Sequence, residues 1–260
     1  MSGDFFLDTN TFMHRLDART KMALAFLTVV AILMFEHPLW LIPITCLSLL
    51  QLSIAGAFRN LRRIRFILIM MSISSMILWN FFSNGVTPLW WKFEVESFLF
   101  AVNRTLMILL IISSGMILIS TTRNEELVLG LIKIGLPYRV GFALSTALRL
   151  LPTIGTSIIT ISQAQRSRGL DLHVKNPLER LRRFLPLLVP VFISTIRNTN
   201  TFAMALESKG FGARDKRSYY LKLEMKRADY LVLGFALVFV SVSIWLRIQG
   251  YGQIAGLTRF

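Results

Sequence analysis

Five apolar runs divide the sequence and predict its main helices. They cover residues 22–35, 39–55, 66–83, 97–120 and 229–247. A helix that crosses the hydrocarbon core of a bilayer needs about 20 residues, within a range of roughly 17–25. The last three runs have that length, the second is marginal and the first is short. The pattern predicts an all-α integral membrane protein with about five transmembrane helices.

The first two runs are separated only by the stretch EHPLW, residues 36–40. Pro38 ends the helix before it, because proline lacks a backbone N–H and disfavours the helical conformation of the preceding residue. The two runs therefore form a tight hairpin. This hairpin either crosses the membrane twice or re-enters it from one side, and the sequence leaves both arrangements open.

Three charged residues precede the first run: Asp17, Arg19 and Lys21. Long cationic side chains at a membrane edge lay their apolar stems along the lipid and extend their charged ends into water. This segment is therefore predicted to be an anchor at the membrane interface.

Positive charge is distributed unevenly between the loops. The chain carries a net charge of +15, with four arginines in residues 59–65 and eighteen Lys and Arg against seven Asp and Glu in residues 121–227. Cytoplasmic loops of membrane proteins are rich in Lys and Arg. The two basic segments follow the second and the fourth apolar run, so with five spans the N-terminus is predicted to be cytoplasmic and the C-terminus external. The positive charge is then explained by the membrane topology. Nucleic-acid binding is not predicted, because the sequence has no basic module with interleaved aromatic residues.

The same topology divides the chain into three regions. Residues 1–120 are predicted to form an N-terminal membrane domain of about four spans. Residues 121–227 are predicted to form a cytoplasmic coupling domain, and residues 228–260 a C-terminal transmembrane helix with its tail.

Two long helices are expected in the coupling domain. The first covers residues 141–168, where polar residues recur every three or four positions along an otherwise apolar run. Such a narrow polar stripe indicates that most of the helix surface is buried in protein or touches lipid. The second helix begins with the favoured N-cap pair Asn176-Pro177, and Pro186 and Pro190 kink or split it.

Both long helices end in a variant of one motif. AQRSRGLD covers residues 164–171, and ALESKGFG covers residues 205–212. As a helix cap, the glycine takes a left-handed conformation and the cation meets the negative end of the helix dipole. As a docking tip, the cation stands beside a small serine and a bare glycine and inserts into an acidic groove on a partner. The two roles are compatible, and the repetition of the motif favours both together.

With these motifs on both helices, the chain resembles the transmembrane T component of energy-coupling factor (ECF) transporters, bacterial vitamin and metal importers related to ATP-binding-cassette systems. SRG (167–169) and SKG (208–210) are similar to the Ala-Arg-Gly-type motifs that end the coupling helices of that family. Further matches are LDARTKM (16–22), TTRNEEL (121–127) and ALRLLPT (147–153). The chain departs from the pattern at Lys209, where the family has an arginine, and lysine is not equivalent to arginine at a bidentate carboxylate site.

The resemblance implies a non-catalytic scaffold in the bacterial cell membrane, and no cofactor is expected. No metal site is expected either, because His14, His37 and His173 are far apart in the sequence. It would bind two cytoplasmic ABC-type ATPase subunits and hold a separate substrate-binding membrane subunit, the S component, so that ATP hydrolysis drives uptake of a vitamin or another micronutrient. The implied ATPase-docking residues are Ser167, Arg168, Gly169, Ser208, Lys209 and Gly210. Four coupling-helix positions would support them: Ala164, Arg166, Ala205 and Glu207. The stretch nearest to a P-loop, SKGFGARDKRS, has Asp215 where that motif needs glycine, which agrees with ATP binding by a partner.

Three alternatives stand beside this function. A T component dedicated to a cobalt or nickel importer would carry similar motifs, although AQRSRG and ALESKGF are more similar to the kind shared among several S components. An integral-membrane enzyme would need paired carboxylates or a histidine cluster, and Glu125 and Glu126 are explained by a helix N-terminus instead. A channel would need a filter motif, and none is visible.

Overall fold

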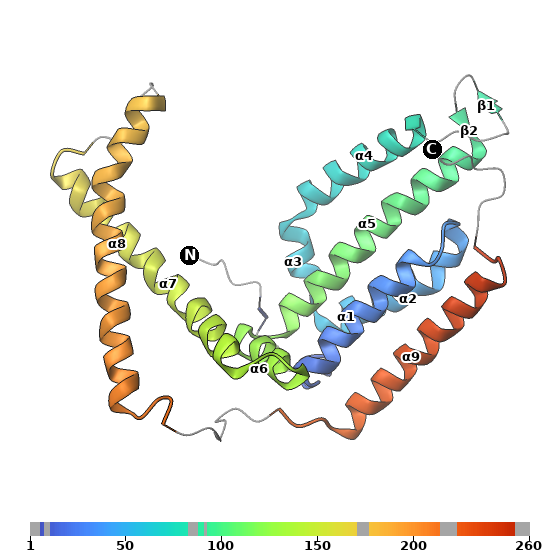
Figure 1. Ribbon diagram of the computed structural model, residues 1–260. Coiled ribbons are helices and arrows are strands. Elements are labelled where there is room, and N and C mark those ends of the chain that lie inside the picture. The colour runs from blue at the N-terminus through green and yellow to red at the C-terminus, as the bar shows by residue number, and fades with distance from the viewer. Residues whose placement is uncertain are drawn as a thin grey trace. The chain divides into compact units, whose positions relative to one another are not determined.

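The computed structural model describes residues 6–7, 11–82, 88–90, 93–170, 177–213 and 223–252. The chain forms two compact units, one of residues 1–135 together with 223–260 and one of residues 136–222. Nearly all of the described residues are helical, which confirms the predicted all-α class (Figure 1). The functional division into membrane domain, coupling domain and C-terminal span stays a prediction.

The first unit is a bundle arranged around one long helix. Its described helices are α1 (Ala18–Leu33), α2 (Pro38–Ala55), α3 (Phe58–Arg63), α4 (Arg65–Phe82), α5 (Val95–Thr121), α6 (Asn124–Ile134) and α9 (Arg227–Ile248). Two short strands, β1 (Pro88–Trp90) and β2 (Phe93–Glu94), pair in antiparallel fashion before α5. α5 is central because it packs against α1, α2 and α4, and α9 packs against α1 (Figure 1).

The second unit is a pair of long helices, α7 (Tyr138–Ser167) and α8 (Pro177–Ser208), which pack against each other. α8 begins at Pro177 as predicted, while Asn176 lies outside the described residues. α8 continues as one helix through both of its internal prolines, so the predicted alternative of a split helix is wrong.

Five of the described helices are long and apolar enough to cross a membrane: α2, α4, α5, α7 and α9. Four of these match predicted runs. The remaining predicted run lies in α1, which has only 16 residues, fewer than the roughly 17–25 that a span requires. The fifth candidate is α7, which has 30 residues and lies in the predicted coupling domain; it qualifies by length and composition.

The predicted break between the first two runs is confirmed. α1 ends at Leu33 and α2 begins at Pro38. His37 is the N-cap of α2, and its Nδ1 accepts a hydrogen bond from the backbone N–H of Leu39 at 3.3 Å. Proline at the first helical position leaves no unsatisfied donor there, so the chain turns within four residues from one helix into the next.

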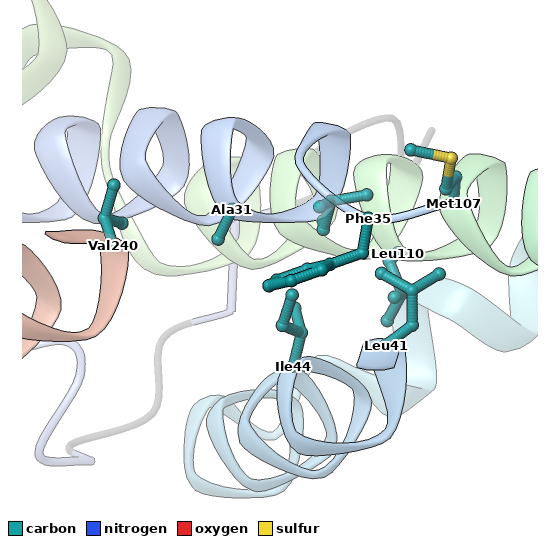
Figure 2. Packing of buried hydrophobic residues seen from close by; sticks show 8 residues of the cluster. Ala31, Phe35, Leu41, Ile44, Met107, Leu110 and Val240 are labelled. Carbon is teal, nitrogen blue, oxygen red and sulfur yellow. The ribbon is translucent and has the colours of Figure 1, made fainter. Parts of the chain in front are cut away.

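Close packing of apolar side chains holds α1, α2, α5 and α9 together. One buried cluster contains Ala31, Ile32, Phe35, Leu41, Ile44, Met107, Leu110 and Val240. In Figure 2, the ring of Phe35 lies over Ile44 of α2. Lipid tails are as apolar as these side chains, so helices in a membrane associate through close van der Waals packing and polar contacts.

A buried polar junction joins the start of α1 to the start of α9. The carboxylate of Asp229 accepts hydrogen bonds from the backbone N–H of Asp17 at 2.9 Å and from that of Lys226 at 2.7 Å. Asp229 is 1% exposed, and both of its oxygens have a donor. This carboxylate therefore connects two segments that are far apart in the sequence.

Lys21 ties the same junction to the end of α5. Its ammonium group donates to the carbonyl oxygens of His14 at 3.0 Å and of Thr121 at 2.8 Å. Burial lowers the pKa of Lys21, while the carboxylates around it act to raise it. Because Lys21 and Asp17 are buried, at 4% and 5% exposure, the prediction that they anchor the chain by reaching into water is wrong.

Candidate functional site

The first predicted docking motif forms the end of α7. Gly169 has a φ of +87°, and its backbone N–H donates to the carbonyl oxygen of Arg166 at 3.0 Å. The next N–H, that of Leu170, donates to the carbonyl oxygen of Gln165 at 3.0 Å. These two bonds are those of a Schellman motif, in which a left-handed residue closes the last turn of a helix.

The second motif repeats this geometry at the end of α8. Gly210 has a φ of +71°, and its N–H donates to the carbonyl oxygen of Glu207 at 2.8 Å. The N–H of Phe211 donates to the carbonyl oxygen of Leu206 at 2.9 Å. The interpretation of both motifs as helix caps is confirmed. We call residues 167–169 the Arg168 tip and residues 208–210 the Lys209 tip.

The serine side chains of both tips form hydrogen bonds to carbonyl oxygens of their own helices. Ser167 Oγ donates to the carbonyl oxygen of Gln163 at 3.1 Å, and Ser208 Oγ donates to that of Ala205 at 3.0 Å. The Arg168 guanidinium and the Lys209 ammonium are exposed, and neither forms an ion pair with any residue that the structure describes. The two cations are thus exposed groups that the described part of the chain leaves without a counter-charge, and their docking role stays a prediction.

All of the predicted site residues are exposed: Ala164, Arg166, Ser167, Arg168, Gly169, Ala205, Glu207, Ser208, Lys209 and Gly210. They do not form one site. Phe211, directly after the Lys209 tip, lies 4.3 Å from Phe142, measured between ring centroids. Phe142 is near the start of α7, whereas the Arg168 tip is at its end, about 40 Å away along the helix. The two tips therefore lie at opposite ends of α7.

Sequence reasoning missed the aromatic contact that places the Lys209 tip. Tyr138 and Phe142 of α7 surround the ring of Phe211, with centroid distances of 6.4 and 4.3 Å. Phe211 was visible only as the large apolar residue after a glycine. The motif signals a cap, but nothing in it indicates which helix the apolar residue contacts.

Both helices of the second unit also expose many large apolar side chains. On α7 these include Leu144, Leu151, Ile158 and Ile159. On α8 they include Leu185, Leu188, Val189, Phe192, Ile193, Ile196 and Met204. Contiguous apolar surface of this kind is typical of protein or membrane contacts. The narrow polar stripe on α7 had indicated such a covered surface.

The paired carboxylates considered for an enzyme lie at a helix N-terminus, as the sequence indicated. Glu125 and Glu126 lie in the first turn of α6, where they complement the positive end of the helix dipole. Within the described residues, no three or more His, Cys, Asp or Glu side chains are grouped so that they could hold a metal ion.

A sequence model of the family described as CbiQ, cobalt transport protein, matches residues 9–220. The chain belongs to this family. The energy-coupling factor transporter transmembrane protein EcfT of Clostridium kluyveri is 29% identical over 257 residues, which cover 92% of this chain and 94% of that protein. The EcfT proteins of Lactococcus lactis subsp. cremoris and Staphylococcus aureus are 29% and 28% identical, each covering 94% of this chain and 97% and 96% of their own lengths.

The matches confirm the resemblance to T components. The regions of this chain that match the CbiQ family and the EcfT relatives include both long helices and both tips. Together with the apolar helices, they identify the chain as a multi-pass transmembrane component of an ECF transporter.

Proposed function

We propose that this T component is a non-catalytic scaffold that couples two ATPase subunits to a separate substrate-binding S component. One ATPase binds the Arg168 tip and the other binds the Lys209 tip. Both tips then face the cytoplasm of a bacterial cell, with the N-terminus inside and the C-terminus outside. Closure of the ATPases on ATP moves the coupling helices, and this movement is passed to the S component.

The observation that carries this proposal is the duplication of one tip at two distant places. Each tip ends in the same glycine cap and exposes one cation without an ion pair among the described residues. A separation of about 40 Å along α7 is too large for both cations to enter one groove. It suits two separate subunits, each of which offers an acidic groove to one cation.

The apolar surface of α7 and α8 suits the remaining roles of a scaffold. Exposed side chains such as Leu151, Phe192 and Met204, at 60%, 63% and 61% exposure, need a covering partner or lipid. We assign the S component to this surface. Methionine repacks readily against different partners, and this favours a scaffold shared among several S components.

A second candidate is a T component dedicated to cobalt or nickel. It is favoured by the description of the matching family, cobalt transport protein. The names of the EcfT relatives mention no substrate. Affinity purification of the complex in mild detergent, followed by mass spectrometry, separates the two candidates. Several different S components indicate a shared scaffold, and a single one a dedicated transporter.

The docking assignment is tested by reversing the charge at both tips. The double variant Arg168→Glu, Lys209→Glu is expected to insert into the membrane at normal levels but to lose the co-purifying ATPases. Because lysine makes only a point-charge contact, Lys209→Glu alone is expected to have the smaller effect. Arg197→Glu is the matched control, since Arg197 is exposed on α8 outside both tips. A double variant that retains stoichiometric ATPases and uptake contradicts the assignment.

The non-catalytic role is tested by purifying the chain without its partners. No ATP hydrolysis above background is expected, because the energy comes from the ATPase subunits. ATP hydrolysis is expected to appear when the ATPase subunits are added. With the double tip variant, the ATPases are expected to keep their basal ATP hydrolysis, which is then not coupled to transport. Turnover that persists in a clean preparation of the T component alone would overturn the scaffold role.

A further inference from the structure

A row of arginines stands on the short helix α3 (Phe58–Arg63), between two helices long enough to span a membrane. Arg59, Arg62 and Arg63 follow one another at helical spacing, and Arg65 begins α4 immediately after. Residues three and four positions apart lie on the same face of a helix. The first three guanidinium groups therefore emerge on one side of α3, and all four arginines are exposed.

The opposite side of α3 is fixed to the bundle. Asn60 is fully buried, and its Nδ2 donates to Ser120 Oγ, at the end of α5, at 2.8 Å. Ala57 is fully buried, and Leu61 packs against the same apolar cluster. With Ala57, Asn60 and Leu61 held inward, α3 cannot rotate to separate the arginines, so the outward face of the helix is fixed as well.

The arginines have no counter-charge in the described structure. Arginines elsewhere in the described structure do have carboxylate partners, as Arg19 has Asp17 and Arg247 has Glu36. Arg59, Arg62, Arg63 and Arg65 contact no carboxylate in the described ranges. Like charges three or four residues apart on a helix destabilise it. A fixed row of three guanidinium groups is thus a site that an anion would stabilise.

The surroundings of the row are apolar. Phe58, Phe66 and Ile67 are 45%, 75% and 56% exposed beside the arginines. α3 connects directly to α2 on one side and α4 on the other, so it lies at the level where two candidate spans leave the hydrocarbon. Arginine binds phosphate oxygens in bidentate fashion, and basic clusters next to a span bind anionic lipid headgroups.

We propose that Arg59, Arg62, Arg63 and Arg65 form a binding site for the headgroup of an anionic phospholipid. The phosphate lies against the guanidinium groups of α3, and the acyl chains lie along Phe66 and Ile67 of α4. An acidic protein surface would match the charge alone. A lipid matches both the cations and the exposed apolar side chains beside them.

The experiment measures lipids retained by the purified full-length chain. The protein is incubated in detergent with equal amounts of phosphatidylglycerol and phosphatidylcholine, and bound lipids are counted by native mass spectrometry. Wild type is expected to retain phosphatidylglycerol in preference to phosphatidylcholine. The triple variant Arg59→Gln, Arg62→Gln, Arg63→Gln is expected to lower phosphatidylglycerol binding about tenfold or more. Its phosphatidylcholine binding is expected to be unchanged.

Two further variants separate a site from general charge. Arg139→Gln, Arg149→Gln, Arg197→Gln removes the same charge from exposed positions of α7 and α8 and is expected to leave lipid binding unchanged. Arg59→Lys, Arg62→Lys, Arg63→Lys keeps the charge, removes the bidentate geometry and is expected to lower binding less than the glutamine variant. If both glutamine variants lose phosphatidylglycerol binding equally, the proposed site is overturned.

Other occupants give different results. Displacement of the lipid by a large excess of glycerol 3-phosphate would indicate a site for free phosphate and would overturn the proposal. Unchanged phosphatidylglycerol binding in the α3 triple variant, with loss of co-purifying ATPases, would indicate a protein contact and would overturn it as well. Neither result depends on the docking roles of Arg168 and Lys209.

Discussion

Phe142 of α7 and Phe211, the residue that follows the Lys209 tip, lie with their ring centroids 4.3 Å apart and their planes at 41°. This contact holds the end of α8 against the start of α7. The Lys209 tip is therefore positioned by tertiary packing as well as by its own glycine cap. Loss of either ring is expected to loosen the tip without removing its charge.

We predict that Phe211→Ala and Phe142→Ala each destabilise the pair of long helices. Their coupling free energy is expected to be about 0.5–1.5 kcal/mol, the range for aromatic pairs beyond buried area. A double-mutant cycle on thermal unfolding of the purified chain measures it. Phe192→Ala, at an exposed position of α8, is the control and is expected to show no coupling to Phe142→Ala. A coupling near zero for Phe142 and Phe211 would show that their contact does not position the tip.

The glycines of the two tips are expected to tolerate alanine poorly. Gly169 and Gly210 have φ values of +87° and +71°, and a left-handed conformation costs a residue with a Cβ about 1–2 kcal/mol. Gly169→Ala and Gly210→Ala should therefore lower the unfolding temperature and weaken ATPase binding. Asparagine at the same positions should do less harm, because it ends helices in this conformation more readily.

Gly155 provides the matched control for that experiment. It lies inside α7, and a Cβ placed there meets no atom within 4 Å. Gly155→Ala is expected to stabilise the helix by about 1 kcal/mol, because alanine has the higher helix propensity. If Gly169→Ala raises the unfolding temperature as Gly155→Ala does, the left-handed cap is not formed in the protein.

We expect Asp229→Asn to destabilise the first unit more than its small change in shape suggests. The amide presents one oxygen where the carboxylate presents two, so either the N–H of Asp17 or that of Lys226 loses its acceptor. An unsatisfied buried donor costs about 1–3 kcal/mol. Glu224→Gln, at an exposed position nearby, should change the unfolding free energy by less than about 0.5 kcal/mol. Equal effects of the two substitutions would show that the junction carries no stability.

The features that the sequence predicted are those with local signals. The turn at Pro38 follows from the chemistry of one proline, and the two caps follow from a glycine after a cation. Both occur in the structure where the pattern put them. The spans were predicted from composition along the chain, which is also local. Because α1 has only 16 residues, the same criterion correctly marked its run as the shortest.

The features that the sequence did not predict depend on pairing between distant segments. Asp229 and Asp17 are 212 positions apart, and no periodicity in either segment indicates that they meet. In the sequence, Lys21 looks like an interfacial anchor. Only its hydrogen bond to the carbonyl oxygen of Thr121 shows that its ammonium group is buried and joins α1 to the end of α5. Phe211 and Phe142 are likewise joined by tertiary packing. A lone charge or aromatic residue next to an apolar run does not carry this information.

The predicted topology can be tested with single cysteines, because Cys46 is the only cysteine in the chain. In a Cys46→Ser background, Arg62→Cys is expected to react with an impermeant maleimide only in inverted vesicles. Gln249→Cys, after the last helix, is expected to react only in intact cells. The opposite pattern would reverse the orientation, and labelling of both positions from one side would contradict the number of spans between them.

His37→Cys decides how the α1–α2 hairpin lies in the membrane. The 16 residues of α1 reach about 24 Å at 1.5 Å per residue, against about 30 Å for a hydrocarbon core. We predict that the buried polar junction at the start of α1 makes up the difference, because its charged groups are hydrogen-bonded inside the protein and need not reach water. Residue 37 should then be labelled in intact cells. If it is labelled only in inverted vesicles, or from neither side, the hairpin re-enters the membrane instead of crossing it twice.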